Sequence, residues 1–512
     1  TVAARGVDLL VHRVALSPDG TQLSLSCNPD LSFDLLDEIA RLGKPRPMLV
    51  GEVDPTLPYI GGSAAVERDF FDLVVSVPGP VPKLFALPRQ PVSDPEFAIG
   101  LYASTLVRDG GTLQIGIGSL SDALCHALVL RHTRNADYLR MLDALDPALR
   151  QSMLVRERGG TAPFAFGLYG ASEMVNDGFM HLRRAGILVR KVLDDQALMQ
   201  RIYAGSASEH DHLRLERDGH WLNGGFYLGS TALYDWLREM PAAEARGLGM
   251  TRISHINELY GGNEALERLQ RREARFFNTC MMMTALGAAV SDGLEDGRVV
   301  SGIGGQYNFV AMAHALRDGR SILMFRAIRE AGGAISSSVP WNYGHCSIPR
   351  HLRDIAINEY GIADLRGLDD AGCVRAMLAI TDSRFAPALR ARAERALKLA
   401  SGPAPTSARE NSPAAIVRTL APFRAAGLLC DYPLGSDFTP EEQRLAKALG
   451  WLKNATATRA GKAGTLLQAL LPGAAPGVDV EAMARMQLAR PAGLGERLQA
   501  RLLRHALAKS AG

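Results

Sequence analysis

The chain has 512 residues, of which 47% are hydrophobic and 22% are charged, and its formal net charge is +3. These values are typical of a folded globular protein with several domains, and they exclude disorder, collagen and coiled coil as overall classes. The charge is too small to predict a nucleic-acid partner. The longest uncharged apolar run, residues 279–290, is shorter than the roughly 20 residues of a membrane span, so we expect no membrane partner.

The cysteines and the N-terminal residues together predict a cytoplasmic location. The six cysteines are scattered and form no CxxC pair. This spacing favours free thiols over a disulfide framework or a zinc site. The first residues lack the apolar segment and small-residue cleavage site of a signal peptide. We therefore expect a reducing compartment and no bound metal.

In the first hundred residues, predicted strands alternate with a predicted helix. Residues 7–11, 48–53 and 71–77 are short apolar runs, as in buried strands. Residues 33–42 have the apolar spacing of a helix and end at Gly43, a residue suited to a C-cap. The alternation predicts an α/β arrangement with a mostly parallel sheet.

A weak internal repeat follows. Residues 109–118 and 296–305 each have the pattern of a turn, a strand and a glycine-rich bend, and a helical pattern follows each. We interpret the pair as two related α/β halves, with chance similarity of glycine-rich turns as the alternative. A polar stretch at 199–224 sets the boundary between the predicted domains 1–215 and 216–400.

The C-terminal part differs in composition from the rest. Residues 401–407 are rich in Ser, Gly and Pro and predict a linker. Residues 440–512 are rich in Ala, Leu and Arg and predict short amphipathic helices broken by Gly and Pro. We therefore expect residues 401–512 to be a linker and a helical extension, with Arg-rich faces that are solvated.

The glycine-rich turns suggest a ligand but do not identify it. Gly116 and Gly118 follow a predicted strand, where exposed backbone N–H groups bind phosphates or oxyanions. The third glycine of the dinucleotide fingerprint is absent, and no Walker pattern occurs in the chain. The chain therefore lacks the sequence motifs of nucleotide-hydrolysing proteins.

Longer segments, in order along the chain, resemble motifs of the acetyl-CoA hydrolase/transferase family, a branch of the class I CoA-transferases that includes 4-hydroxybutyrate CoA-transferases. They are VGEVDPTLP at 50–58, DGGTLQIGIG at 109–118, LYGASEMVNDG at 168–178, GFYLGS at 225–230, SGIGGQYNF at 301–309, and PR at 349–350 with EYGIADLRG at 359–367. The resemblance implies two similar open α/β halves with a mostly parallel sheet each, CoA bound between them, and a homodimer.

The chain departs from this family at the nucleophile. The resemblance implies that a glutamate attacks the acyl-CoA thioester, but the corresponding segment, 278–287, has Met282 at the Glu position and Thr284 at the Asp position. No carboxylate occurs between residues 274 and 291. A thioether does not form an anhydride, so the chain is a divergent branch.

Three interpretations remain open. Water could attack the thioester, with Glu258 as the catalytic base beside His255. A displaced carboxylate, Glu258, Glu295 or Glu173, could serve as a surrogate nucleophile. The protein could also bind acyl-CoA without turnover.

Two other residue types have simpler explanations. Cys280 lies in an apolar run, where an inert buried thiol is the expected state and attack on a thioester is the alternative. His345 and His351 flank a Pro-Arg pair without further metal-ligating residues, so we expect no metal site there.

The expected binding residues for CoA or substrate are mostly glycines of the motif segments, because glycine lets a ligand approach the backbone closely. They are Gly304, Gly305, Gln306, Gly361, Gly116 and Gly118. The Gln306 amide donates and accepts hydrogen bonds. The expected function is acyl-CoA thioester hydrolysis or CoA transfer to a carboxylic acid, and the alternative is a non-catalytic acyl-CoA-binding or regulatory protein. CoA is expected as a substrate, with no permanently bound cofactor.

Overall fold

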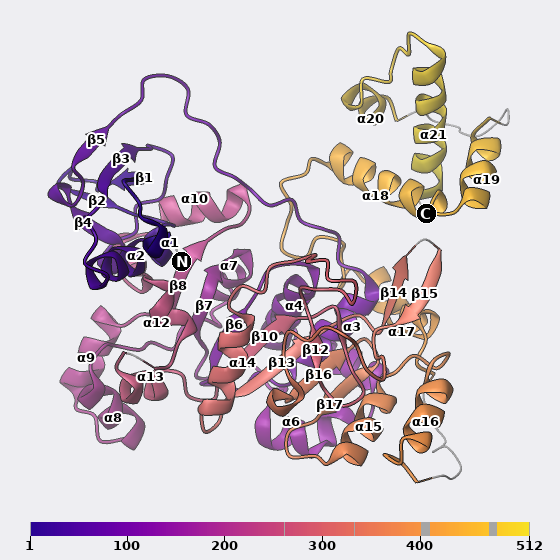
Figure 1. Cartoon of the computed structure of the whole chain (residues 1–512), viewed down its shortest axis with the longest axis horizontal. Helices are drawn as coiled ribbons and strands as arrows, with labels where there is room; N and C mark the ends of the chain where they lie inside the picture. The colour runs from indigo at the N-terminus through magenta and orange to yellow at the C-terminus, as the bar shows by residue number, and fades with distance from the viewer. Residues whose placement is uncertain (1, 261, 332, 401–409, 471–478, 511–512) are drawn as a thin grey trace. The chain divides into compact units, whose positions relative to one another are not determined.

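The computed structural model describes residues 2–260, 262–331, 333–400, 410–470 and 479–510. The chain divides into two compact units, which are described separately (Figure 1). The first unit comprises Thr1–Ala327 and Ser337–Gly435, and the second comprises Ile328–Ser336 and Ser436–Gly512.

A small five-stranded sheet begins the first unit. Its order is β4-β2-β1-β3-β5, and its bounds are β1 Leu9–Leu16, β2 Gln22–Ser24, β3 Met48–Val53, β4 Ala65–Glu67 and β5 Leu73–Val75. β1, β3 and β5 are parallel, and β2 and β4 complete the sheet in antiparallel pairs. Helix α2 (Pro29–Arg41) packs Phe33 and Leu36 against the sheet's apolar cluster. The three strands and the helix predicted in this region are confirmed.

The main sheet of the first unit has eight strands in the order β17-β16-β13-β10-β6-β7-β8-β9. Their bounds are β6 Thr112–Ile115, β7 Tyr169–Val175, β8 Leu222–Tyr227, β9 Leu248–Met250, β10 Arg275–Thr279, β13 Arg320–Met324, β16 Ile355–Asn358 and β17 Gly361–Asp364. Every neighbouring pair is parallel except β16 and β17. The expected α/β class with mostly parallel sheets is confirmed.

One detail of the expected architecture differs. β6 pairs directly with β10, so strands before and after residue 215 lie in one sheet instead of forming a separate sheet in each half. The domain boundaries at residues 215 and 400 stay sequence predictions.

Helices cover both faces of the main sheet. Phe276 and Phe277 are consecutive in β10, so their side chains point to opposite faces. Phe276 stacks edge-on against Phe309 of α14 (Gln306–Ala315), with ring centroids 5.1 Å apart. Phe277 belongs to the large core cluster that contains α3 (Asp94–Ser104) and α4 (Ser119–Thr133). α4 and α14 therefore lie on opposite faces of the sheet.

The other helices of the first unit lie around this core. Their bounds are α1 Val2–Arg5, α5 Asn135–Leu145, α6 Met153–Arg158, α7 Asp177–Arg184, α8 Gln196–Ala204, α9 Glu209–Asp218, α10 Thr231–Glu239, α11 Ala242–Ala245, α12 Ile253–Asn257, α13 Glu264–Gln270, α15 Asp370–Ala379, α16 Ala386–Arg395 and α17 Pro413–Ala425. A short hairpin, β11 (Met282–Met283) with β12 (Ala289–Val290), follows β10.

The second unit contains a β-hairpin and helices. The hairpin is β14 (Ile328–Ala331) with β15 (Ala334–Ser337). The helices are α18 Pro440–Ala455, α19 Arg459–Leu470, α20 Val480–Arg485 and α21 Leu494–Ser510, and α18, α20 and α21 share a small apolar cluster. This agrees with the short helices expected for 440–512. The predicted linker 401–407 lies outside the described residues. No helix in the described part of the chain is long and apolar enough to cross a membrane.

Candidate functional site

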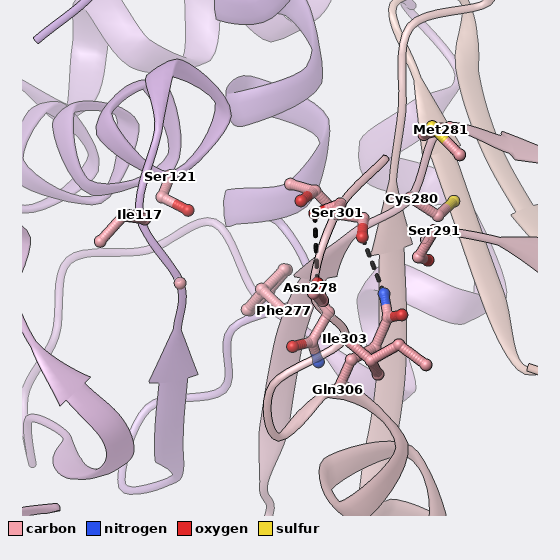
Figure 2. A pocket seen from close by; sticks show the side chains of 13 residues that line it. Ile117, Ser121, Phe277, Asn278, Cys280, Met281, Ser291, Ser301, Ile303 and Gln306 are labelled. Carbon is pink, nitrogen blue, oxygen red and sulfur yellow. Dashed lines mark hydrogen bonds between the residues drawn. The ribbon is translucent and has the colours of Figure 1, made fainter. Parts of the chain in front are cut away.

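A cavity of about 330 Å³ lies in the first unit where β6 and β10 end. In an open parallel sheet the carboxyl ends of the strands form the usual ligand-binding edge. The cavity is lined by Gly116, Ile117, Ser121, Phe277, Asn278, Thr279, Cys280, Met281, Ser291, Ser301, Gly302, Ile303 and Gln306. Figure 2 shows Ile117 and Ser121 on one side and Asn278, Ser291, Ser301 and Gln306 on the other.

Two helices begin at this cavity from opposite faces of the sheet. α4 starts after Gly118, whose φ of 108° is a backbone conformation that favours glycine. α14 starts after Gly305. The first N–H groups of a helix have no intrahelical acceptor, and they carry a partial positive charge. The first turns supply Ser121 and Gln306 to the lining, and Gly118 and Ser119 at the start of α4 line the neighbouring cavity.

Three buried polar atoms of the lining have no hydrogen-bond partner among the described residues. They are Ser121 Oγ, Ser291 Oγ and Gln306 Oε1. Ser121 is 3% exposed and Gln306 is 5% exposed. Leaving a buried polar group unpaired costs about 1–3 kcal/mol. Because these three atoms have almost no accessible surface, none of them faces the open part of the cavity.

Among the described residues, the lining contains no charged side chain. Cys280 is the thiol of this lining, and burial raises its pKa to about 12. A thiol with this pKa is overwhelmingly protonated at neutral pH and is a poor nucleophile. This agrees with the inert buried thiol that the sequence predicts. In the part of the chain that the structure describes, no group of three or more His, Cys, Asp or Glu could hold a metal ion.

The structure brings part of the predicted binding residues together. Gly116 and Gln306 line the cavity, and the Gln306 Nε2 atom donates to the Thr279 carbonyl at 2.7 Å (Figure 2). Gly118 instead lines a neighbouring cavity, beyond Ile117. Gly361 begins β17 opposite Asn358, three strands from β10, and lines neither cavity.

Gly304 and Gly305 contact Glu173, which is part of β7. A Cβ on Gly305 would lie 2.0 Å from Glu173 Oε2, so the carboxylate would have to move to admit it. The Asn257 side chain donates to the same Oε2 at 2.8 Å. Glu173 Oε1 has no hydrogen bond in the described part of the chain, and it is not a buried atom. Glu173 is thus a half-buried carboxylate with one oriented and one accessible oxygen at the start of α14.

The structure places Glu258 elsewhere. Glu258 is exposed and follows the last residue of α12, and it does not line the cavity. Its backbone carbonyl accepts a hydrogen bond from Arg271 at 2.9 Å. His255 is also exposed, and no hydrogen bond joins the two side chains among the described residues. Glu295 is exposed as well, and its carboxylate accepts from the Gly344 N–H at 2.8 Å.

Met282, which the sequence resemblance places at the family's glutamate, is fully buried. It pairs with Val290 in the β11–β12 hairpin, has 0% exposure and does not line the cavity. Its neighbour Met281 does line it. The described chain between β10 and α14 therefore supplies the cavity with amide, hydroxyl, thiol and thioether groups but no carboxylate.

The neighbouring cavity, of about 310 Å³, is lined in part by Arg89, Gly118, Asp122 and Asp177. The Arg89 guanidinium lies 2.6 Å from Asp177 and 3.3 Å from Asp122. Burial raises the pKa of Asp122 to about 6. Because this guanidinium is already paired with two carboxylates, it offers little positive charge to a phosphate.

Sequence reasoning missed Ser121, Ser291 and Asn278. Ser121 lies three residues after Gly118, at the first turn of a helix that follows a strand, and this spacing was available in the sequence. Ser291 and Asn278 had no comparable signal, because their place in the lining depends on how the β11–β12 hairpin folds back on β10.

Comparisons with known proteins agree with this architecture. Residues 229–393 match the family model described as acetyl-CoA hydrolase/transferase C-terminal domain. The chain is 24% identical over 368 residues to the 4-hydroxybutyrate coenzyme A transferase of Clostridium kluyveri, covering 71% of this chain and 68% of that protein. It is 22% identical to the succinyl-CoA:cyclohexane-1-carboxylate CoA transferase of Geobacter metallireducens, covering 62% of this chain and only 57% of that protein.

Solved structures share the fold. RipA from Yersinia pestis superposes with a TM-score of 0.56 at 21% identity, covering 78% of this chain and 73% of that chain. The 4-hydroxybutyrate CoA-transferase of Porphyromonas gingivalis superposes with a TM-score of 0.51 at 22% identity, covering 76% of this chain and 75% of that chain.

Proposed function

We propose that this chain, which belongs to the acetyl-CoA hydrolase/transferase family, binds acyl-CoA and cleaves its thioester, by hydrolysis or by CoA transfer to a carboxylic acid. The observation that supports chemistry at the cavity is the convergence of α4 and α14 on it. Attack on a thioester carbonyl creates an oxyanion. Preorganised N–H and hydroxyl donors in a site of low water content stabilise such an oxyanion, and this stabilisation often contributes more to the rate than any other effect.

Water is the proposed attacking group, because the described lining contains no carboxylate. A water oxygen bonds to the carbonyl carbon, a carboxylate takes the proton, and the C–S bond breaks to release CoA thiolate and the acid. Glu258 is the base predicted from the sequence. Glu173 is its competitor, because its Oε1 is accessible and its Oε2 accepts a hydrogen bond from Asn257. Like Glu258, it lies outside the residues that line the cavity, so either base would act through a bridging water.

We propose for the glycines the roles that the sequence predicts. Gly116, Gly304 and Gly305 allow close approach of the acyl group or the pantetheine arm, and Gly118 and Gly361 shape the turns on either side. CoA is proposed as a substrate, not as a resident cofactor. The family resemblance further supports a cytoplasmic homodimer with no nucleic-acid or membrane partner, and light scattering in solution tests the dimer.

A second function, acyl-CoA binding without turnover, is favoured by one specific observation. Met282 is fully buried at the position of the family's glutamate, and among the described residues no other carboxylate has replaced it in the lining. A protein of this kind would hold the thioester between the two helix ends and release it unchanged.

Thiol release from a panel of acyl-CoAs separates these functions. Release without an acceptor acid supports hydrolysis, and release only with an acceptor supports transfer. Saturable CoA binding with no release supports the binding function and overturns the enzymatic one. Glu173→Gln and Glu258→Gln form a matched pair for the base, since each removes one carboxylate and keeps the side-chain shape.

A further inference from the structure

The small sheet of the first unit is covered on one face and open on the other. Leu10, Leu49 and Val74 point to the face that α2 covers, and they belong to its apolar cluster. Their neighbours along the strands point to the opposite face, and no apolar cluster of the described residues contains them. These neighbours are Leu9 and Val11 of β1, Met48 and Val50 of β3, and Leu73 and Val75 of β5.

The strand register arranges this open face in rows. Leu9 lies beside Met48, and Val11 lies in one row with Val50 and Leu73. Leu9, Val11, Met48 and Leu73 are each between 45% and 55% exposed. Parallel strands are normally covered on both faces, and a contiguous exposed apolar patch marks an interaction site. The open face therefore has the character of a surface that another surface covers.

A pair of opposite charges ends the apolar rows. In the register, Arg13 of β1 lies beside Glu52 of β3. The Arg13 side chain is 38% exposed, and its Nη1 atom lies 3.4 Å from Asp54 Oδ2, which leaves its other N–H groups available. Glu52 is half-buried, and its carboxylate has no hydrogen bond or ion pair in the part of the chain that the structure describes. One end of the open face thus presents an available donor and an available acceptor side by side.

We propose that the open face of β1, β3 and β5 is the interface of the homodimer, and that the same face of a second copy covers it. A two-fold axis parallel to the strands, between β1 and β3, places each β1 residue over its row neighbour in β3 of the second copy. Leu9 then packs on the partner's Met48, and Val11 packs on the partner's Val50. Arg13 lies against the partner's Glu52, and the symmetry makes each contact twice.

The charged row selects this axis among the possible ones. Two sheets pack face to face about 10 Å apart with their strands roughly aligned, which an axis over any strand would allow. An axis over β3 would place Glu52 against the partner's Glu52, and an axis over β1 would place Arg13 against the partner's Arg13, so like charges would repel in both. Only the axis between β1 and β3 matches apolar rows with apolar rows and Arg13 with a carboxylate. This inference rests on the proposed function only in taking the homodimer from it.

The test is sedimentation velocity of the full chain over a series of micromolar concentrations. We expect the wild-type chain to dimerise. Val11→Lys places an ammonium group at the centre of the interface and should weaken the dimer at least about thirtyfold, the loss that a central interface residue causes. Val417→Lys makes the same change at a 47% exposed valine of α17, outside the open face, and should stay within about twofold of the wild type.

A second variant tests the charged row. Glu52→Arg makes Arg13 face an arginine of the second copy and should weaken the dimer at least about tenfold at about 0.05 M salt, but less at about 0.5 M salt, because salt screens the repulsion. Val11 and Glu52 lie on the open face, so both variants should keep the urea-unfolding midpoint of the wild type, which shows that any loss of the dimer is not a loss of the fold.

The outcomes separate the interface from the function. A wild-type dimer that Val11→Lys leaves intact would put the interface elsewhere and overturn this inference, while the homodimer stands. A wild-type chain that stays monomeric would overturn both, and equal weakening by Val11→Lys and Val417→Lys would also overturn the interface. CoA binding, measured on the same samples, tests the proposed function by itself, because the open face shares no residue with the cavity at β6 and β10.

Discussion

Restoring a glutamate at position 282 tests whether the family's nucleophile position still reaches the cavity. Met282 has 0% exposure, and its strand neighbour across the hairpin, Val290, is buried as well. A carboxyl group placed there has to stay neutral, because burying a lone carboxylate costs far more than protonating it. We therefore expect Met282→Glu to destabilise the first unit and to give no covalent adduct with acyl-CoA.

The size of this effect follows from the pKa that burial imposes. An unfolded Glu has a pKa of about 4.3, and fully buried Glu residues reach about 8 to 9. Keeping the folded carboxyl neutral at pH 7 then costs about 2.7 × 1.36, or roughly 4 kcal/mol, and at pH 5 roughly 1 kcal/mol. Because the folded pKa is raised above the unfolded one, the penalty grows as pH rises between about 4 and 8, and acid relieves it.

Urea unfolding at pH 5 and pH 8 measures the penalty, with two matched variants. Met282→Leu conserves volume and should cost less than about 1.5 kcal/mol at both pH values. Met281→Glu makes the same chemical change one residue earlier, where the side chain is half-buried at the cavity, and should be tolerated better. The reasoning fails if Met282→Glu is as stable as Met281→Glu at pH 8, or if mass spectrometry finds acyl or CoA on the new carboxylate.

Three further predictions concern the base, the thiol and a buried ion pair. If the chain hydrolyses acyl-CoA, Glu173→Gln should lower the rate of thiol release by roughly a hundredfold or more, and Glu258→Gln should leave this rate within about twofold. A larger loss of rate in Glu258→Gln would instead support Glu258, the base predicted from the sequence. N-ethylmaleimide at pH 7 should label the exposed Cys430 and leave Cys280 unmodified, because the pKa of Cys280 is about 12; peptide mapping detects either outcome. Arg320→Ala should cost about 3 kcal/mol in urea unfolding, because it removes one of the two guanidinium groups that contact a buried carboxylate; a loss below about 1 kcal/mol would contradict this.

The fold was predictable where the sequence pattern is local. The apolar runs at 7–11, 48–53 and 71–77 correspond to β1, β3 and β5, because short runs of β-branched and other apolar residues favour strands, although one face of each strand is partly exposed. The shared main sheet was not predictable in the same way. Pairing between β6 and β10 joins residues more than 150 positions apart, and no local pattern encodes such a partner.

The candidate site, like the fold, was predictable only where a local sequence pattern marks a residue. Gly116 and Gln306 were found because each belongs to a recognisable turn before a helix. The contact between Glu173 and Gly305 depends on where the chain before α14 lies relative to β7, and no local sequence pattern predicts it. Glu258 was chosen for its nearness to a glycine in the sequence, but α12 ends there with the side chain exposed. Nearness along the chain is a poor guide to a site that several strands build together.

The internal repeat explains why a cavity of this kind does not depend on one carboxylate. The bends at 109–118 and 296–305 precede α4 and α14, and both helices begin at the same cavity. The strand predicted within 296–305 is wrong, because these residues form only an isolated bridge between Gly293 and Val299, whereas the helix predicted after them is present as α14. Donors at a helix start are backbone N–H groups, which most substitutions leave in place. On the proposed function, the two helix starts bind and polarise the carbonyl, and water supplies the attacking group in place of the glutamate that the family resemblance leads us to expect.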